Sequence, residues 1–493
     1  MTDEIATTTA VAQDGPPTTR LPDGFQVQVD SRVTVSDDGR HLVGGSPTRL
    51  LSLAPRAASM VDCDGRLVVS DESTATVARR LLDAGIAHPR PMFGPSVEDV
   101  TIVVPVRDNQ SGLDRLLAVL DATHVVVVDD GSQVPVQAPG ATVVRTEVSV
   151  GPAAARNLGA ARSETPFVAF VDSDVVPENS WLFTLLAHFS DPAVAVVAPR
   201  VVALSHDGGV TARYEALCSS LDMGRREGPV VPGTRLSYVP SAAIIVRRSA
   251  FPGFDERLHV AEDVDLCWRL TAAGWTVRYD PIATVAHDHR TVLRAALARR
   301  RFYGTGAAPL SRRHPGHAAP VVVTVPTAVA ALAALTRSRW GAGVVLAMIA
   351  VIAGRVYRRV EKVPDAASVA ARLTAEAVGF GFLQVAAALC RHYWPVSVVL
   401  ALLSARFRTV LVAVAIVDGV AEWVRAEMLN PDPIEPLGVT RFLVLRRLGD
   451  LAYGAGLWQG VVTTRTTTAL RPTIVRASDP GASRAAAAAS AAR

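Results

Sequence analysis

Residues 166–181 read PFVAFVDSDVVPENSW, and this stretch decides how the middle of the chain folds. Its apolar run predicts a buried β-strand that ends at Val171 and meets two carboxylates, Asp172 and Asp174. Successive side chains of an extended strand point to opposite sides, so both carboxylates reach one point only if the chain turns directly after the strand. Pro177 and the lack of further alternation predict such a turn.

Two carboxylates with few other protein ligands suit a magnesium or manganese ion that is held together with substrate phosphates. Such an ion bridges protein and diphosphate, and it stabilises the charge of a diphosphate that leaves. A solvated loop with stray acids explains D-x-D alone at least equally well, because the pattern is short. The neighbouring segments therefore have to decide between a metal site and a loop.

Strands and helices alternate over about 99–305 and predict an α/β domain with a mainly parallel sheet. The segments DVTIVVPVRD, HVVVVDDGS and PFVAFVDSDVVP have the continuous apolar runs of buried strands. Ligands of such sheets bind beyond the carboxyl ends of the strands. Asp129 and Asp130 lie at one of those ends, where acids accept hydrogen bonds from a nucleotide base or ribose, although alone they indicate an ordinary turn.

Two further segments offer groups for a nucleotide and for proton transfer. Arg156 follows Gly151-Pro152 at a helix start, where N–H groups and a guanidinium bind phosphate, although Arg156 alone would suit a surface ion pair. In residues 258–281, LHVAEDVDLCWRLTAAGWTVRYDP, three acids crowd a helix start. One acid at a helix start is explained by its interaction with the free N–H groups of the first turn. A further acid that lies near a sugar hydroxyl can act as a general base. His287 ends the strand-like stretch VRYDPIATVAH and is either a metal ligand or a structural histidine.

Length and composition bound the rest of the chain. The 493 residues exceed one ordinary core, so we expect two or three domains. Hydrophobic residues make up 49% and charged residues 19%, which indicates that part of the chain meets lipid. A net charge of +4 without an aromatic-interleaved basic stripe argues against nucleic-acid binding. Four widely spaced cysteines argue for reduced thiols in a cytosolic protein, and the first residues lack the pattern of a signal peptide.

The ends of the chain differ from its middle. Residues 1–20 are predicted to be a disordered lead, and 471–493 a low-complexity, disordered tail. The unit at 21–98 combines a period-two strand, FQVQVDSRVTV, with helical patterns such as STATVARRLLDAG. This combination suits a small winged-helix-like α+β module, and a plain structural appendage explains it equally well.

Residues 306–470 form a third, helical unit of Ala- and Val-rich apolar segments. The first segment, 318–335, is about long enough to cross a bilayer, and most of the others are shorter. Arginines interrupt the segments, so helices in a membrane and helices of a soluble core are both compatible with the pattern. We favour membrane association, through 318–421.

Six motifs carry a resemblance to known enzymes over about 99–305. They are VVPVRD, VVVVDDGS, GPAAARNLGAA, VDSDVVP, VPSAAIIVRRSAFPGFDERL and EDVDLCWRLTAAGWTVRYDP. In this order and spacing they resemble the inverting glycosyltransferases of family 2, although each motif alone is weak. The resemblance implies an α/β domain of the GT-A fold that binds a nucleotide sugar, and a metal-dependent, inverting transfer.

The resemblance also implies roles for particular residues. Asp263 would be the catalytic base, and Asp174 and His287 would hold Mg²⁺ or Mn²⁺. The nucleotide-sugar donor would be bound by Pro105, Arg107, Asp129, Asp130, Arg156, Asp172, Ser241, Ala242 and Glu262. One departure concerns the Q-x-x-R-W motif of processive synthases, where this chain reads RRRFYGTG at 299–306. The departure favours a shorter-chain transferase, in which Tyr303 shapes the acceptor side.

The order of the three units is similar to that of the glycosyltransferases of the mycofactocin system. This resemblance implies transfer of a hexose, glucose from UDP-glucose, onto a peptide-derived redox cofactor, and growth of a β-linked oligosaccharide. The module at 21–98 would then be similar to peptide-recognition winged helices, with a precursor peptide as partner. The expected location is the cytoplasm or the cytoplasmic face of the cell membrane.

These expectations combine into a single in-line displacement. Asp263 takes the proton of an acceptor hydroxyl, the diphosphate leaves beside the metal and Arg156, and the anomeric configuration inverts. One alternative is a membrane glycosyltransferase that extends a lipid-linked or cell-wall glycan. Another is a non-catalytic nucleotide-sugar or peptide-binding protein, against which the acids of D-x-D and Asp263 argue. A nucleotidyltransferase would leave E-D-x-D-L-x-x-R without a role. The sugar, the nucleoside, the number of sugars and the oligomeric state stay open.

Overall fold

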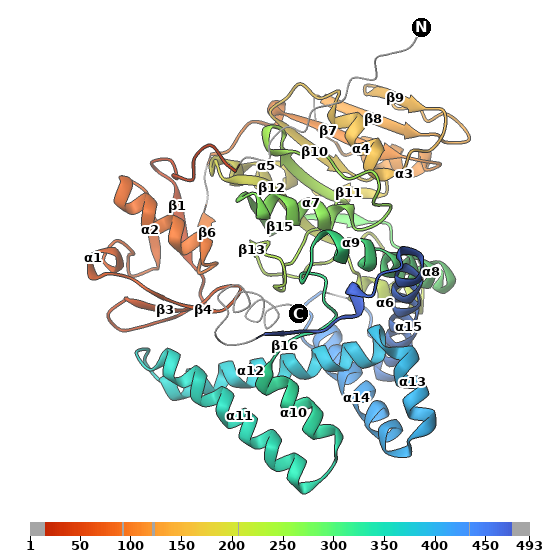
Figure 1. The fold of residues 1–493 in the computed structure, drawn as a ribbon. Coiled ribbons are helices and arrows are strands. Elements are labelled where there is room, and N and C mark those ends of the chain that lie inside the picture. Colours follow the sequence, from red (N-terminus) through yellow and green to blue (C-terminus); the bar gives the residue numbers. More distant parts are fainter. Residues whose placement is uncertain (1–14, 91–92, 121–123, 206, 433, 476–493) are drawn as a thin grey trace.

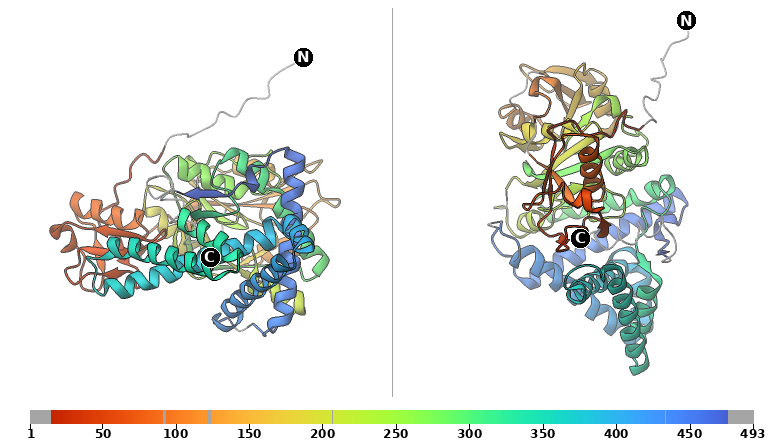
Figure 2. Two further views of the ribbon diagram at one scale, coloured as in Figure 1. Left: turned by 60° about the horizontal axis from the view of Figure 1, so that its bottom comes forward. Right: turned by 90° about the vertical axis from the view of Figure 1, so that its left-hand side faces the viewer.

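The computed structural model of the chain describes residues 15–90, 93–120, 124–205, 207–432 and 434–475. Figure 1 shows three parts: a large central sheet with its helices, a small unit from the start of the chain at one side, and a group of long helices below. Figure 2 shows from two further sides that both outer parts lie against the central one. Most of the predicted lead and tail, residues 1–14 and 476–493, lies outside the described residues.

The central sheet has nine strands in the order β11-β15-β12-β14-β10-β7-β8-β9, with β13 paired to β15. In chain order the strands are β7 (Val100–Val106), β8 (His124–Asp130), β9 (Thr142–Thr146), β10 (Phe167–Val171), β11 (Val175–Pro177), β12 (Val194–Ala203), β13 (Gly228–Pro229), β14 (Ala243–Arg247) and β15 (Thr276–His287). The pairs β10–β7, β7–β8, β8–β9 and β12–β15 are parallel.

The prediction of a mainly parallel sheet was wrong for the other half of the pairs. Strand β14 runs antiparallel between β10 and β12, and β11 and β13 run antiparallel to β15. Strand β14 is buried along most of its length, so it has the same continuous apolar run as a parallel strand. A continuous apolar run shows that both faces of a strand are buried, but it does not show whether the strand runs parallel or antiparallel to its neighbours.

Seven helices accompany the sheet. They are α3 (Gln110–Leu117), α4 (Pro152–Ala160), α5 (Trp181–Leu186), α6 (Val210–Cys218), α7 (Glu262–Ala272), α8 (Leu293–Thr305) and α9 (Ala307–Arg313). Six of them pack against the sheet, whereas α8 packs mainly against a helix from the end of the chain. Neighbouring residues of β7 point to opposite faces: Ile102 packs in one core with Leu113 of α3, and Val103 in a second core with Leu266 of α7. Two cores fix the sheet, so the ends of its strands are held firmly.

The small unit at the start of the chain contains two three-stranded sheets and two helices. Its elements are β1 (Gln26–Val29), β2 (Thr34–Val35), β3 (His41–Gly44), β4 (Arg49–Ser52), α1 (Pro55–Ala58), β5 (Arg66–Val68), α2 (Glu72–Asp83) and β6 (Ala87–Arg90). The sheet orders are β5-β1-β6 and β2-β3-β4. Helix α2 begins where the pattern predicted, with Asp71 accepting a hydrogen bond from the Thr74 N–H. Arg79 of α2 pairs with Asp191 at 2.7 Å and ties the unit to the central part.

The helical group at the end of the chain consists of long, mostly antiparallel helices. They are α10 (Val325–Leu335), α11 (Arg339–Val360), α12 (Ala366–Ala387), α13 (Trp394–Leu403), α14 (Ala405–Trp423) and α15 (Val439–Thr464), and α12 continues into the turn η4 (Ala388–His392). Two short strands, β16 (Val322–Thr324) and β17 (Thr473–Val475), pair in parallel. Buried ion pairs join α14 to α15, including Arg446 Nε to Asp418 at 3.0 Å.

Two helical segments of this group are long and apolar enough to cross a membrane. They are Arg339–Val360, with 6% of its apolar window buried, and Ala366–His392, with 33% buried. Length and composition alone are weak evidence for a membrane span, because core helices pass the same test. Most apolar residues of α11 therefore lie outside the cores of the chain, although Val360 at its end packs in a small cluster with Val43 of the small unit.

Candidate active site

A cavity of about 1080 Å³ opens at the carboxyl ends of four strands. Its wall includes Pro105 of β7, Asp130 at the end of β8, Asp172 directly after β10 and His287 at the end of β15. These four strands point the same way, because β15 pairs in parallel with β12 and β14 reverses direction between β12 and β10. The cavity therefore lies at the edge of the sheet where α/β proteins bind their ligands.

Arg156 lies at the centre of the charged wall and connects two acids. Its guanidinium donates to Asp172 Oδ1 at 2.6 Å and to Glu262 Oε1 at 3.0 Å, and its side chain is almost fully buried. Arg156 lies on helix α4. The N-cap of this helix is Gly151, whose φ of 91° is a conformation that favours glycine. The face of Phe254 lies 5.5 Å from the guanidinium carbon. Arg156 thus orients both carboxylates.

Asp263 stands in the first turn of α7 and faces the same cavity. Its Oδ2 accepts the N–H of Ser241 at 3.3 Å, and its Oδ1 accepts the N–H of Val264 at 2.8 Å. Burial, and then the negative charge of Glu262, raise the pKa of Asp263 to about 7. A carboxylate with such a pKa can accept a proton near neutral pH, which is the property a general base requires.

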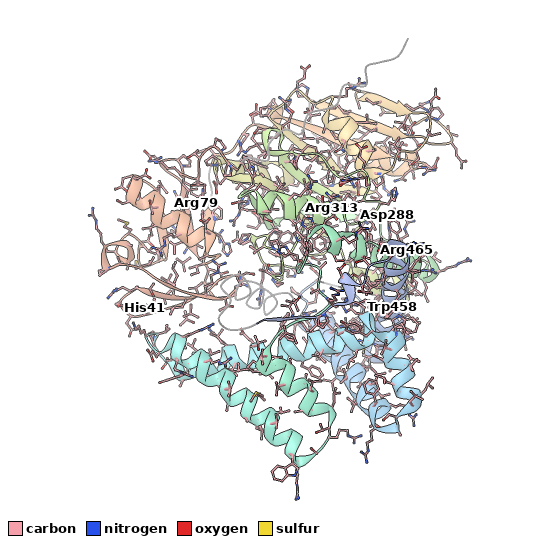
Figure 3. All side chains as sticks on the ribbon, in the orientation of Figure 1. His41, Arg79, Asp288, Arg313, Trp458 and Arg465 are labelled. Carbon is pink, nitrogen blue, oxygen red and sulfur yellow. The ribbon has the colours of Figure 1, made fainter. Side chains whose placement is uncertain are left out.

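The third acid of this helix has a structural position instead. Asp265 is fully buried and binds Arg269 at 2.7 Å, Arg313 at 2.9 Å and His314 at 2.8 Å. It therefore joins α7 to α9, and Figure 3 shows Arg313 of α9 beside the sheet. The three crowded acids divide into one that pairs with Arg156, one that faces the cavity and one that holds two helices together.

Asp174 and His287 approach each other across paired strands. Val175 of β11 lies opposite His287 of β15, and Asp174 Oδ1 is 3.5 Å from His287 Nε2. His287 Nδ1 lies 2.9 Å from His289 Nδ1, which leaves Nε2 directed at the carboxylate. Burial lowers the pKa of His287, which favours the neutral imidazole that binds a metal, and raises the pKa of Asp174, whose carboxylate a bound cation would keep ionised.

This pair fits a divalent cation that takes its remaining ligands from a diphosphate and water. Within the described residues there is no group of three or more His, Cys, Asp or Glu side chains arranged around one metal position. An all-protein cage is therefore not formed there, whereas a site with one carboxylate, one imidazole and open positions is compatible with Mg²⁺ or Mn²⁺. The D-x-D turn predicted from the sequence exists, since the N–H of Val175 donates to Asp172 O at 3.1 Å.

Asp129 and Asp130, predicted to contact the nucleotide, are both engaged by the protein. Asp129 is 1% exposed, lies outside the cavity wall and accepts the N–H groups of Ser132 and Val136 as well as a bond from Arg145. Asp130 lines the cavity and accepts the N–H of Gly151 at 3.0 Å. Asp130 therefore holds the start of α4 at the cavity edge.

The remaining predicted donor contacts all lie at the cavity. Ser241 and Ala242 are buried just before β14, and the N–H of Asp172 donates to Ala242 O at 2.9 Å. Arg107 follows β7 with a side chain that is 58% exposed, so it can move toward a ligand. Pro105, Glu262 and the acids described above complete the set.

The cavity also has a second wall that the motifs did not reveal. Tyr238 comes from the loop after β13, Arg391 and His392 from η4, and Tyr453 from α15. No local pattern marks these residues, because they come from segments far apart in the chain. Tyr303 of α8, predicted to shape the acceptor side, lines the cavity among them.

Comparison with known proteins gives the site a family context. The model of the family described as "Glycosyl transferase family 2" matches residues 101–253. Proteins described as "Pre-mycofactocin glycosyltransferase" from two strains of Mycobacterium tuberculosis are 52% identical over 475 residues, which is 92% of this chain and 99% of theirs. The O-antigen chain rhamnosyltransferase WbaN of Salmonella anatum is 24% identical over 197 residues, 37% of this chain and 62% of its own.

Solved structures overlay less closely. A mannosyltransferase from Pyrobaculum calidifontis, in complex with GDP-Man and Mn²⁺, has a TM-score of 0.33 at 15% identity and covers 54% of this chain and 79% of its own. TarS 1-349 from S. aureus has a TM-score of 0.29 at 20% identity and covers 42% of this chain and 65% of its own. At these TM-scores the overlays carry no argument about the site.

Proposed function

This chain belongs to the family of pre-mycofactocin glycosyltransferases, and from that premise we propose that it transfers glucose from UDP-glucose to a hydroxyl of its peptide-derived acceptor. We propose further that repeated transfer builds a β-linked oligosaccharide on the redox cofactor mycofactocin. The observation that carries the proposal is the position of Asp263, a carboxylate with a pKa of about 7 that faces a cavity between the strand ends and the helical group.

The donor would lie along the strand ends. The nucleoside would contact Pro105, Arg107 and Asp130, with Asp129 supporting that wall from behind. Arg156 holds Asp172 in place from one side and supplies positive charge beneath the diphosphate. Ser241 and Ala242 would lie against the sugar, directly beside the carboxylate of Asp263.

Asp263 would remove the proton of the attacking hydroxyl while the diphosphate leaves on the opposite side of the anomeric carbon. A one-step displacement of this kind inverts the anomeric configuration. Glu262 keeps Asp263 basic through its negative charge, and Arg156 keeps Glu262 in place. Asp174 and His287 would hold Mg²⁺ or Mn²⁺, which when bound neutralises charge on the departing diphosphate.

We propose a location at the cytoplasmic face of the membrane, and the exposed apolar side chains of the helical group support contact with a membrane. Several large apolar side chains stand far out of the fold: Trp340 is 78% exposed, Leu402 76% and Leu403 80%. Arg339 lies beside the first of them, and Arg406 and Arg408 follow the other two. Apolar side chains flanked by arginines are typical of helices that lie in a membrane interface with anionic lipids. This feature also favours the second candidate, a transferase for a lipid-linked or cell-wall glycan.

The small unit at residues 21–98 is proposed to bind a precursor peptide. Strand β5 is one edge of its first sheet and has an exposed first and last residue, whereas the other edge, β6, is mostly buried. An edge strand presents unpaired N–H and C=O groups to which an extended peptide can add as a further strand.

The proposal is tested by incubating the protein with UDP-glucose, Mg²⁺ or Mn²⁺ and pre-mycofactocin, and following product mass. Successive hexose increments are expected with the wild type and none with Asp263→Asn. Asp37→Asn is the matched control, because Asp37 is exposed in a turn of the small unit. Hydrolysis of UDP-glucose without any increment would contradict the acceptor and would favour lipid-linked or cell-wall glycans, which are tested next as extracted acceptors.

A further inference from the structure

Helix α15 forms part of the cavity although it lies far beyond the segment that matches the family 2 model. That segment ends at residue 253, and α15 begins at Val439. Three residues of α15, one helical turn or slightly more apart, line the cavity: Gly449, Tyr453 and Leu457. The turn η4 adds Arg391 and His392 from the helix next to it. The helical group therefore closes the side of the cavity that faces away from the strand ends.

Glycines bring α15 unusually close to α8. A Cβ at Gly304 of α8 would lie 2.1 Å from the carbonyl oxygen of Tyr453, and a Cβ at Gly456 of α15 would lie 1.8 Å from that of Arg301. A Cβ at Gly454 would lie 2.0 Å from the carbonyl oxygen of Arg391. Because these backbones lie so close together, the position of Tyr453 relative to α8 and η4 is fixed. Figure 3 shows Trp458 on α15, below the sheet, and its Nε1 donates to His392 O at 2.8 Å.

Three tyrosines from three separate segments line the same cavity as Asp263. Tyr238, Tyr303 and Tyr453 all line the cavity, and each is partly buried. Burial raises the pKa of Tyr238, and Asp263, Tyr453 and Tyr303 raise it further, which shows that the four groups lie within electrostatic reach. Burial likewise raises the pKa of Tyr303, with Asp263 among the further causes. Neutral phenols next to the base give a wall that is flat, uncharged and able to donate and accept hydrogen bonds.

Arg391 adds a hydrogen-bond donor to this wall. Its Nε donates to Asp450 Oδ1 at 2.7 Å, and its guanidinium carbon lies 5.7 Å from the centre of the Tyr453 ring. Among the residues that the structure describes, no other hydrogen bond of the Arg391 guanidinium is formed. Asp450 therefore fixes the direction of a guanidinium whose terminal nitrogens are left for an oxygen of a ligand.

We infer that Tyr238, Tyr303, Tyr453 and Arg391 form the acceptor subsite, and that α15 is its specificity-determining wall. The ligand is a ring that carries hydroxyl groups, which packs one face on the tyrosines and offers one hydroxyl to Asp263. This inference rests on the proposed function and names where its second substrate binds.

A hydroxylated ring can belong to the aglycone itself or to a sugar already attached to it. The two sources are separated by using pre-mycofactocin and its monohexosyl product as two acceptors. A subsite for the aglycone binds only the first tightly, whereas a subsite for sugar rings binds the second at least equally well. Either result supports the subsite, and only the identity of the ring differs.

The subsite is tested by acceptor binding to the full-length protein saturated with UDP, a condition that allows no transfer. For Tyr453→Ala, the Kd of the acceptor is expected to rise about tenfold while the Kd of UDP stays within about twofold. Tyr453→Phe keeps the ring and is expected to bind the acceptor nearly as the wild type does. Tyr357→Ala on α11, which removes an exposed tyrosine outside the cavity wall, is the matched control.

Unchanged acceptor binding by Tyr453→Ala would overturn the inference, and so would an equal loss of UDP binding. Should Tyr453→Ala not fold, Tyr303→Ala carries the same test from α8. Failure of the proposed function has a different signature, namely wild-type protein that adds no hexose in the mass assay. Acceptor binding without turnover would therefore keep the subsite and remove the transferase.

Discussion

The backbone N–H of Ser241 donates to the carboxylate of Asp263 at 3.3 Å. This contact joins the first turn of α7 to the segment that leads into β14, so the position of Asp263 depends on the central sheet. Burial, and then the negative charge of Glu262, raise the pKa of this carboxyl to about 7, although the N–H groups of Val264 and Ser241 lower it. The contact therefore fixes the position of the group, while burial and Glu262 keep it basic.

The pH dependence of transfer follows from this pKa. Asp263 must be ionised to accept a proton, so kcat/KM is expected to fall as pH drops below about 7 and to reach a plateau above it. The charged groups around Asp263 are Glu262, which raises the pKa, and Arg156, which lowers it. A profile of kcat/KM between pH 5 and 9 measures the apparent pKa, and a flat profile would contradict the assignment.

Glu262→Gln is expected to move that profile to lower pH, because it removes the negative charge that raises the pKa of Asp263. The direction of the shift is informative, since loss of an unrelated structural contact would lower kcat without moving the apparent pKa. Glu164→Gln is a suitable control, because Glu164 is exposed in a loop before β10. A shift to higher pH would contradict the proposed electrostatic role of Glu262.

Arg156→Leu is expected to destabilise the protein and to abolish donor binding. It would leave Asp172 and Glu262 without their shared partner inside a buried site, which costs about 3–5 kcal/mol. Thermal unfolding and titration with UDP measure the two effects. Arg107→Leu, which removes an exposed arginine at the same cavity, is expected to weaken UDP binding with little change in melting temperature.

How far the sequence predicts this site can be judged from particular residues. Asp172 and Asp174 directly follow the apolar strand β10, as the local pattern predicted, and both line the same cavity as Asp263 of α7. The different roles of the acids in α7 could not be predicted from the sequence. Glu262 pairs with Arg156 and Asp265 with Arg313, and both arginines lie on other helices. The roles assigned to the individual donor contacts stay predictions.

The second wall of the cavity was largely beyond sequence reasoning. Gly304 and Gly456 have no local partner that explains them, and only the crossing of α8 and α15 shows why a side chain is excluded. The direction of β14 was missed for a similar reason, because burial on both faces conceals strand direction. Both features depend on contacts between residues far apart in the chain, which local sequence motifs do not show.

Gly456→Ala is expected to impair transfer by forcing α15 away from α8. Its Cβ would lie 1.8 Å from the carbonyl oxygen of Arg301, a distance that only movement of a helix can relieve. Gly343→Ala on α11 is the matched control, because a Cβ there meets nothing within 4 Å and an alanine stabilises a helix by about 0.5–1 kcal/mol. Melting temperature and acceptor KM are measured for both. Equal behaviour of the two variants would contradict the close packing.

His287→Ala is expected to raise the Mg²⁺ or Mn²⁺ concentration required for half-maximal transfer, because loss of an imidazole 3.5 Å from Asp174 removes a proposed ligand. Chelation by EDTA is expected to stop transfer by the wild type, and added metal to restore it. His41→Ala, in the small unit and labelled in Figure 3, serves as control. Full transfer in EDTA would contradict the metal site.

The most direct test of the account compares wild type and Asp263→Asn for hexose transfer to pre-mycofactocin and, in parallel, for UDP binding. The account predicts that the rate of transfer falls about a thousandfold while the Kd of UDP stays unchanged, because asparagine retains the shape of the side chain but cannot accept the proton. Transfer by Asp263→Asn at the wild-type rate would contradict the assignment of Asp263 as the base.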